Sequence, residues 1–256
     1  MATVSGWKTA LVTGAASGIG RCFAEALARH RTAVGLIDVS ADGLAHAGEG
    51  LAKSGRVHTR VADVGDASQV GVAVDALASD LGGIDLVIHC AAILGPGHFA
   101  QQSAADFDRL VRIDLLGTAN VVRAVLPLLR QSHGAIACLA STAAVHGWPA
   151  LGAYSAAKFG VAGFCDAVRS ELARDGVSLT SVFPLLIDTP LLSGANIPPI
   201  LKMGKRLPPD VVVRKTLAAV AARHPRVFIP ASVRLVAALH GLAPSLLDWY
   251  GRRFGY

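Results

Sequence analysis

The chain carries the sequence KTALVTGAASGIGRCFAEALARH at residues 8–30. Its first six residues form a short apolar run typical of a buried strand, and the pattern from Cys22 to His30 is that of a helix. Between them stand three glycines, which let the backbone turn tightly before a helix N-terminus whose unpaired N–H groups attract anions. This order predicts a binding site for the pyrophosphate of a dinucleotide. We expect its contacts from Gly14, Ser17, Gly18, Ile19 and Gly20.

An acidic residue follows at the distance that such a site requires. The apolar run from Ala33 to Ile37 predicts a second strand, and Asp38 stands directly after it, 18 residues beyond Gly20 (38 − 20 = 18). A carboxylate in this place accepts hydrogen bonds from the adenosine ribose hydroxyls and repels a 2′-phosphate. We therefore expect NAD as the cofactor in preference to NADP.

The remaining sequence alternates apolar runs with helical patterns. Strands are expected at 56–61, 84–89, 135–140, 178–183 and 226–229, and helices at 41–53, 67–81, 104–129, 152–174 and 209–223. Strands that are apolar throughout belong to parallel sheets covered on both faces. We therefore expect residues 1–256 to form a single-domain α/β fold of the Rossmann type, a doubly wound parallel sheet of about seven strands with ligands beyond its C-terminal strand ends.

A tyrosine and a lysine stand four residues apart in the helical pattern at 152–174, which places Tyr154 and Lys158 on one helix face. A phenol ordinarily has a pKa of about 10, and a fixed ammonium beside it favours the ionised form. Ser141 follows the strand expected at 135–140, where its hydroxyl can donate a hydrogen bond to a substrate oxygen. The three side chains are candidates for one catalytic site.

Hydride transfer from an alcohol carbon requires a base at the hydroxyl, because the proton must leave as the carbonyl forms. We expect Tyr154 to be that base, and Lys158 to favour its tyrosinate and to hold the nicotinamide ribose. Ser141 would polarise the substrate oxygen. A serine hydrolase is disfavoured, because Ser141 lies in LASTA and lacks the G-x-S-x-G motif.

These motifs resemble those of a known family. Thr13-Gly14-x-x-x-Gly18-x-Gly20, Ser141 and Tyr154-x-x-x-Lys158 are similar to the signature of the short-chain dehydrogenase/reductases, which are single-domain nicotinamide enzymes with a doubly wound sheet. The resemblance runs from about Trp7 to about Pro230. It implies adenine contacts at Asp63 and Val64, and it implies that the segment after the sixth strand holds the nicotinamide carboxamide.

The chain departs from the family pattern after the fourth expected strand. His89-Cys90-Ala91-Ala92 stands where the family usually has Asn-Asn-Ala-Gly. An asparagine that braces the central strands is thereby lost. Cys90 and Ala92 are still small, so we expect the cofactor to pass close to Cys90, Ala91 and Ala92.

A second departure lies in the nicotinamide loop, where Leu185 replaces a glycine that usually follows the proline. We therefore expect the carboxamide contacts from Pro184, from the backbone of Ile187 and from Thr189.

A third departure concerns the long helix before Pro127. Asp114 stands where the family usually has an asparagine whose backbone carbonyl holds a water molecule in a proton relay to the lysine. An aspartate keeps the main-chain contact. We expect its carboxylate also to stabilise the Lys158 ammonium and so to oppose the lowering of the pKa of Tyr154.

Composition sets limits on partners. Hydrophobic residues make up 52% of the 256 residues, charged residues only 16%, and the mean hydropathy is +0.49. We expect apolar surface to be buried in a homodimer or homotetramer, because no apolar run reaches the ~18 residues of a membrane span. The net charge of +6 does not indicate nucleic acid, since lysines and arginines are scattered singly. The four cysteines lack metal-ligand spacing and predict buried thiols in a cytoplasmic protein without a metal site.

The residues expected around the site are mostly apolar and suit a hydrophobic alcohol or ketone: Ile93, Leu94, His146, Trp148, Leu151, Leu185, Leu186, Leu191 and Leu192. Residues 191–207 contain few helix signals and are expected to form a substrate lid. Residues 231–256 form an amphipathic tail, which packs between subunits or lies on a membrane surface.

The sequence thus favours an NAD(H)-dependent oxidoreductase that interconverts a hydrophobic secondary alcohol and its ketone. One alternative is an NADPH-dependent ketoacyl-thioester reductase, in which Lys202, Lys205 and Arg206 meet an acidic carrier. The other is a catalytically weak nucleotide-binding protein, suggested by the asparagines that the chain lacks.

Overall fold

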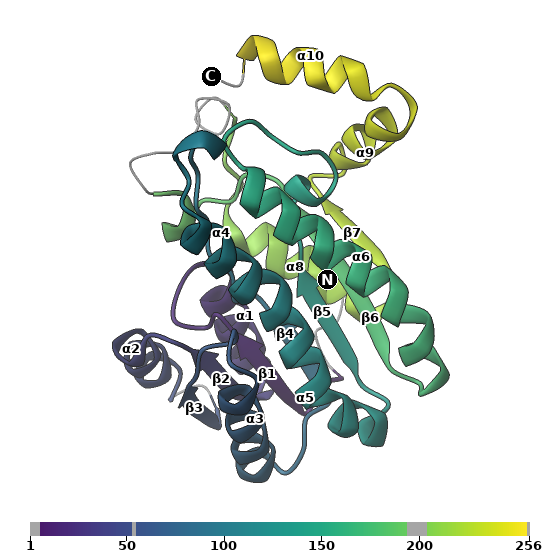
Figure 1. Cartoon of the computed structure of the whole chain (residues 1–256). Helices are drawn as coiled ribbons and strands as arrows, with labels where there is room; N and C mark the ends of the chain where they lie inside the picture. Colours follow the sequence, from purple (N-terminus) through teal and green to yellow (C-terminus); the bar gives the residue numbers. More distant parts are fainter. Residues whose placement is uncertain (1–5, 53–54, 194–203, 255–256) are drawn as a thin grey trace.

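The computed structural model describes residues 6–52, 55–193 and 204–254. Within them, seven strands form one parallel sheet in the order β3-β2-β1-β4-β5-β6-β7. The strands are β1 (Thr9–Thr13), β2 (Ala33–Asp38), β3 (Val57–Val61), β4 (Leu86–His89), β5 (Ala135–Leu139), β6 (Ser178–Pro184) and β7 (Arg226–Ile229). Helices lie on both faces of the sheet (Figure 1), so the predicted single-domain Rossmann-type fold is confirmed.

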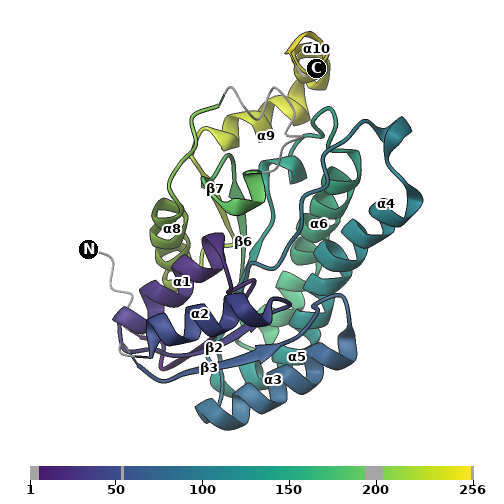
Figure 2. The same ribbon diagram turned by 90° about the vertical axis from the view of Figure 1, so that its left-hand side faces the viewer.

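Two layers of helices cover the sheet (Figure 2). One layer holds α1 (Gly18–Arg29), α2 (Ala41–Leu51) and α8 (Pro209–Ala221); the other holds α3 (Ala67–Leu81), α5 (Gly117–Ser132) and α6 (Gly152–Arg174). Side chains of a strand alternate between the two faces of the sheet. Ala10 and Val12 of β1 therefore pack in the core under α1, α2 and α8, and Leu11 packs in the core under α3, α5 and α6. Because both faces are covered, all of β1 is buried, which explains its apolar sequence.

The strand order creates the site. From β1 the chain winds outward to β2 and β3, and then returns to place β4 on the other side of β1. The reversal between β1 and β4 opens a crevice at the C-terminal strand ends. The candidate residues that follow or end strands all fall at this edge: Gly14, Asp38, Asp63, Ala91, Ser141 and Pro184.

The helix expected at 104–129 differs from the prediction. α4 (Ala104–Leu110) passes into a π-helical segment, Val111–Leu116, before α5 begins at Gly117. A π-helical turn accommodates an extra residue and is frequent at functional sites. Here it carries Asp114, whose side chain is completely buried.

The lid expected at 191–207 lies largely outside the described residues, since 194–203 are not among them. At its start, Pro190–Leu192 forms a 3₁₀ turn, and near its end Leu207 pairs with the backbone of Leu186 and Asp188. The tail forms two helices, α9 (Val233–Leu242) and α10 (Pro244–Phe254), drawn in yellow in Figure 1. Among the described helices, none is both long and apolar enough to cross a bilayer.

Candidate active site

The glycine turn between β1 and α1 has the shape of a cradle. Gly14 and Gly18 have φ angles of +66° and +55°, which glycine adopts without strain. A Cβ on Gly14 would stand 2.8 Å from the amide nitrogen of Ala91, and a Cβ on Gly20 would collide with the carbonyl oxygen of Gly14. Ser17 at the start of α1 makes no side-chain cap, so the first N–H groups of the helix are left for an anion. The turn therefore fits a pyrophosphate.

Asp38 ends β2 beside this turn. Its Oδ2 accepts a hydrogen bond from the N–H of Ala16 at 3.0 Å, and its Oδ1 accepts one from the N–H of Ser40 at 3.0 Å. Each carboxylate oxygen keeps a further lone pair for a ribose hydroxyl. Asp38 therefore both positions the glycine turn and presents negative charge at the adenosine side.

Asp63 lies after β3 and pairs with an arginine that the sequence did not identify. Its Oδ2 is 2.8 Å from Nη1 of Arg112, and its Oδ1 accepts from the N–H of Gly65 at 2.8 Å. Burial alone would raise the pKa of Asp63, but these contacts hold it below its usual range. The neighbouring Val64 is buried, and its carbonyl accepts a hydrogen bond from Asn120 at 3.0 Å.

His89 ends β4 and is buried. Its Nδ1 lies 2.8 Å from Oγ1 of Thr13 on β1, and its Nε2 lies 3.1 Å from Oγ1 of Thr118 on α5. Thr13 Oγ1 also accepts from the N–H groups of Cys90 and Ala91, both at 3.2 Å. The sequence predicts that a brace of the central strands is lost here; the structure shows that histidine supplies one.

The partners of His89 determine its tautomer. Because two N–H groups use the lone pairs of Thr13 Oγ1, the threonine proton is donated to Nδ1 of the ring. Nε2 then carries the ring proton and donates to Thr118, whose hydroxyl donates to the carbonyl of Asp114 at 2.6 Å. Burial, together with the charge of Lys158, lowers the pKa of His89 to about 3, so the ring is neutral.

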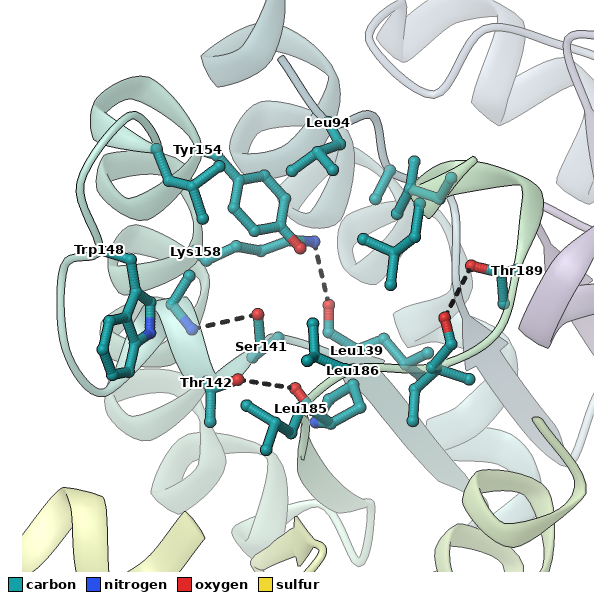
Figure 3. A pocket seen from close by; sticks show the side chains of 18 of the residues that line it. Leu94, Leu139, Ser141, Thr142, Trp148, Tyr154, Lys158, Leu185, Leu186 and Thr189 are labelled. Carbon is teal, nitrogen blue, oxygen red and sulfur yellow. Dashed lines mark hydrogen bonds between the residues drawn. The ribbon is translucent and has the colours of Figure 1, made fainter. Parts of the chain in front are cut away.

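Tyr154, Lys158 and Ser141 lie together at the mouth of the crevice (Figure 3). Tyr154 is only 9% exposed, and the Lys158 ammonium stands 5.6 Å from the centre of its ring. Lys158 Nζ donates to the carbonyl of Leu139 at 3.2 Å, and Ser141 Oγ accepts from the N–H of Ala143 at 3.1 Å. The serine proton is thus left for the phenol of Tyr154 or for a molecule in the cavity.

Asp114 forms an ion pair directly with the lysine. Its Oδ2 is 3.1 Å from Nζ of Lys158, and its Oδ1 accepts from the N–H of Ile93 at 2.9 Å. Both charged side chains are almost completely buried. Removing one partner of such a pair leaves a buried charge and typically costs about 3–5 kcal/mol. Asp114 makes this contact from the π-helical segment.

The charges of this group shift two pKa values. Burial alone would lower the pKa of Lys158, but the negative charge of Asp114 and the phenol of Tyr154 outweigh it and raise the pKa. Burial raises the pKa of Tyr154; Lys158 opposes this, Asp114 adds to it, and a hydrogen bond with Ser141 lowers it. The net result is a raised pKa for Tyr154. The expected stabilisation of the Lys158 cation is therefore found, whereas a lowered pKa of the free tyrosine is not.

The catalytic candidates open onto a cavity of ≈ 250 Å³. Predicted site residues that line it are Ile19, Cys90, Ala92, Ser141, Tyr154, Lys158, Pro184, Ile187 and Thr189. The other predicted site residues do not line this cavity: Gly14, Ser17, Gly18, Gly20, Asp38, Asp63, Val64, Ala91 and Asp114. The apolar lining comes from Leu94, Trp148, Leu151, Leu185, Leu186, Leu191 and Leu192, as expected, whereas Ile93, also expected there, does not line this cavity.

Two aromatic residues differ from expectation. His146 does not line the cavity; it is buried, with its Nδ1 3.2 Å from Nδ1 of His240 on α9 and its ring edge-on to Trp148. Tyr250 of α10 does line the cavity, although the sequence gives no reason to place it there. The only signal was the amphipathic pattern of the tail, which does not say what the helix covers.

Comparisons with known proteins show the family and the fold of the chain. A family model described as short chain dehydrogenase matches residues 8–197. The D-threitol dehydrogenase of Mycolicibacterium smegmatis is 35% identical over 186 residues, 72% of this chain and 72% of that protein. The ketoacyl reductase HetN of a Nostoc species is 30% identical over 268 residues, 100% of this chain and 91% of that protein. Among solved structures, an alcohol dehydrogenase of the archaeon Thermococcus sibiricus, complexed with 5-hydroxy-NADP, shares the fold with a TM-score of 0.77 at 23% identity, covering 87% of this chain and 96% of that one.

Asp114→Asn is expected to lower the pKa of Tyr154, because it removes a negative charge that favours the neutral phenol. The chain has three tyrosines. The signal of Tyr154 is therefore obtained by subtracting the tyrosinate absorbance of a Tyr154→Phe derivative from that of its parent, for wild type and for Asp114→Asn. The reading is taken just after a pH jump, before alkaline unfolding. Asp108→Asn, on the exposed face of α4, serves as the control. Identical titration curves for wild type and Asp114→Asn would contradict the assignment.

The buried neutral His89 is expected to make stability depend on pH. Its pKa is about 3 in the folded chain and 6.5 ordinarily, so between these values the unfolded chain binds the extra proton and stability falls as pH falls. One proton corresponds to about 1.4 kcal/mol per pH unit. Urea unfolding between about pH 6 and about pH 4 should show this additional slope in wild type and not in His89→Asn. Parallel curves would mean that His89 titrates normally in the folded state.

Proposed function

The chain belongs to the short-chain dehydrogenase/reductase family, whose members are NAD(P)-dependent oxidoreductases, and we propose that it interconverts a hydrophobic secondary alcohol and its ketone with NAD(H). One observation carries the proposal: Ser141, Tyr154 and Lys158 meet at a cavity of ≈ 250 Å³ whose other walls are mostly apolar. An apolar pocket with a few convergent polar groups is typical of a site for a small hydrophobic molecule.

The glycine cradle and Asp38 support NAD(H) as the coenzyme. The turn accepts a pyrophosphate close to the backbone of Ala91, where a side chain on Gly14 would collide. Asp38 offers acceptors to ribose hydroxyls and repels a phosphate at the 2′ position. When bound, the nicotinamide supplies or accepts the hydride.

The roles of the side chains follow from their geometry. In ketone reduction, Tyr154 Oη gives its proton to the substrate oxygen, and in alcohol oxidation it takes that proton. Ser141 Oγ donates a hydrogen bond to the same oxygen and stabilises negative charge that develops there. Lys158 stays cationic beside the phenol, and we propose that it also donates hydrogen bonds to the nicotinamide ribose. Asp114 acts as a positioning residue that keeps Lys158 charged and in place.

The raised pKa of Tyr154 matches its role as an acid. A neutral phenol at physiological pH is ready to donate a proton, which is the requirement of ketone reduction. Oxidation needs the tyrosinate, which forms more readily as pH rises. We therefore expect oxidation to have an optimum on the alkaline side.

The ketoacyl-thioester alternative has support from a relative with that activity in its name. Its expected docking cations have weaker support. Arg206 lies 3.5 Å from Asp188 and also donates to the carbonyl of Leu192, and Lys202 lies outside the described residues. The alternative of a catalytically weak protein was suggested by the missing asparagines. It has less support, because His89 connects the central strands and Asp114 pairs with Lys158.

We further propose a homodimer or homotetramer in the cytoplasm. Large apolar side chains stay exposed on several elements, among them Leu116 near α5, Phe159 on α6 and Leu242 on α9. Where exposed apolar side chains gather into a contiguous patch, they commonly mark an association surface. Contact of the tail with a membrane surface is the alternative for α9 and α10. All four cysteines are free thiols, which suits a reducing compartment.

Tyr154→Phe tests the catalytic role. It removes the transferable proton and keeps the ring, so turnover of lipophilic ketones with NADH should fall at least about a hundredfold. The affinity for NADH, measured by its fluorescence, should change less than about twofold, because the glycine cradle is intact. Tyr250→Phe removes a second phenol from the same cavity and should retain most activity. Unchanged turnover in Tyr154→Phe would exclude Tyr154 as the acid.

Side-by-side titration with NADH and NADPH tests the coenzyme assignment. Wild type should bind NADH at least about tenfold more tightly, since Asp38 repels the 2′-phosphate. Asp38→Asn removes the charge and keeps one oxygen acceptor. The ratio of the NADH and NADPH affinities should therefore fall, mainly because NADPH binds more tightly. Equal affinities in wild type would contradict the preference for NAD.

A further inference from the structure

A second cavity adjoins the catalytic one. We call the catalytic cavity of ≈ 250 Å³ the inner chamber and this one, of ≈ 670 Å³, the outer chamber. The outer chamber lies between the loop after β4, α4 with the turn before it, and the start of the lid at Pro190. Leu94 and Leu191 line both chambers, so the two spaces meet at these side chains. A long molecule held at Tyr154 can therefore continue into the outer chamber.

The outer chamber is chemically different from the inner one. Gln101, Gln102, Asp106 and Arg109 contribute polar side chains to its wall. Gln102 donates from Nε2 to the carbonyl of Gly95 at 3.4 Å, while its Oε1 is buried and accepts no hydrogen bond from the described residues. A buried oxygen without a donor is destabilising, because it has lost its hydrogen bonds to water. This oxygen is therefore suited to receive a hydrogen bond from a ligand.

Arg109 supplies a cation whose charge is not neutralised. Within the described part of the chain it has no ion-pair partner, whereas Arg112, one turn along the same helical stretch, is paired with Asp63 at 2.8 Å. The nearby Asp106 bonds instead to the hydroxyl of Ser103 at 2.7 Å, in the cap of α4. Asp106 reduces the positive potential of the chamber but does not bind the guanidinium.

We propose that the outer chamber holds the far end of the substrate, and that this end carries a carboxylate that pairs with Arg109. The substrate class is then an oxo- or hydroxyalkyl carboxylate: its apolar part occupies the share of the inner chamber that the nicotinamide leaves free, and its charged end reaches α4. A group with an N–H or O–H in the chain would also satisfy Gln102. This inference rests on the proposed function, and it narrows the substrate from any hydrophobic ketone to an anionic one.

The test compares straight-chain methyl ketones with methyl ketones of equal length that end in a carboxylate. In wild type with NADH, the carboxylates should have the higher kcat/KM at one favoured chain length. Arg109→Gln should lower kcat/KM for that carboxylate about tenfold and change the neutral ketone less than about twofold. Arg109→Lys should recover part of the loss, and Arg123→Gln, an exposed arginine on α5, should behave like wild type.

Two results would overturn the inference. If Arg109→Gln lowered kcat/KM equally for the carboxylate ketone and the neutral ketone, Arg109 would not bind the carboxylate. If Arg109→Gln bound NADH more weakly and left the ratio of kcat/KM for the two ketones unchanged, the outer chamber would bind part of the coenzyme and not the substrate. If wild type turned over no ketone, the proposed function would fail. The role of Arg109 could still be decided by measuring carboxylate binding through the fluorescence of Trp148. The other two tryptophans would be replaced for this measurement.

Discussion

The buried ion pair between Asp114 and Lys158 is the interaction on which the active site depends. Two opposite charges leave water in this pair, and such a pair is tolerated only when each charge has further hydrogen bonds. Lys158 has the carbonyl of Leu139, at the end of β5, and Asp114 has the N–H of Ile93, after β4. The pair therefore ties α6, the helix that carries Tyr154, to the edge of the sheet at two neighbouring strands, and holds a positive charge beside that tyrosine.

The ion pair is continuous with the brace of the central strands. A chain of hydrogen bonds runs from Thr13 at the end of β1 through His89 and Thr118 to the backbone of Asp114. One end of this chain adjoins the glycine turn and the other adjoins the catalytic lysine. Because the ring of His89 is neutral and each proton has one acceptor, the connection does not change over the physiological pH range. The glycine turn and the Tyr154–Lys158 pair are thus connected through one continuous set of buried hydrogen bonds.

The sequence was sufficient for features with a strong local signal. The bounds of α3 and α6 and of β7 agree with the predicted ranges, because apolar periodicity and glycine or proline punctuation act over neighbouring residues. The grouping of Ser141, Tyr154 and Lys158 was also predictable, since Ser141 follows β5 and the helix that carries the other two begins at the same edge of the sheet. The π-helical segment was not, because one extra residue in a turn leaves the surrounding helical pattern nearly unchanged. Contacts between distant positions, such as His146 with His240, have no local signal at all.

The most direct test of the central interaction is the ¹H–¹⁵N spectrum of the lysine side chains, with Lys158 assigned through Lys158→Arg. We predict an ammonium signal for Lys158 that is protected from exchange and persists to higher pH than those of the exposed lysines, since Asp114 raises the pKa of Lys158. In Asp114→Asn the signal should titrate at lower pH. A Lys158 side chain that is already a neutral amine near neutral pH in wild type would contradict the account.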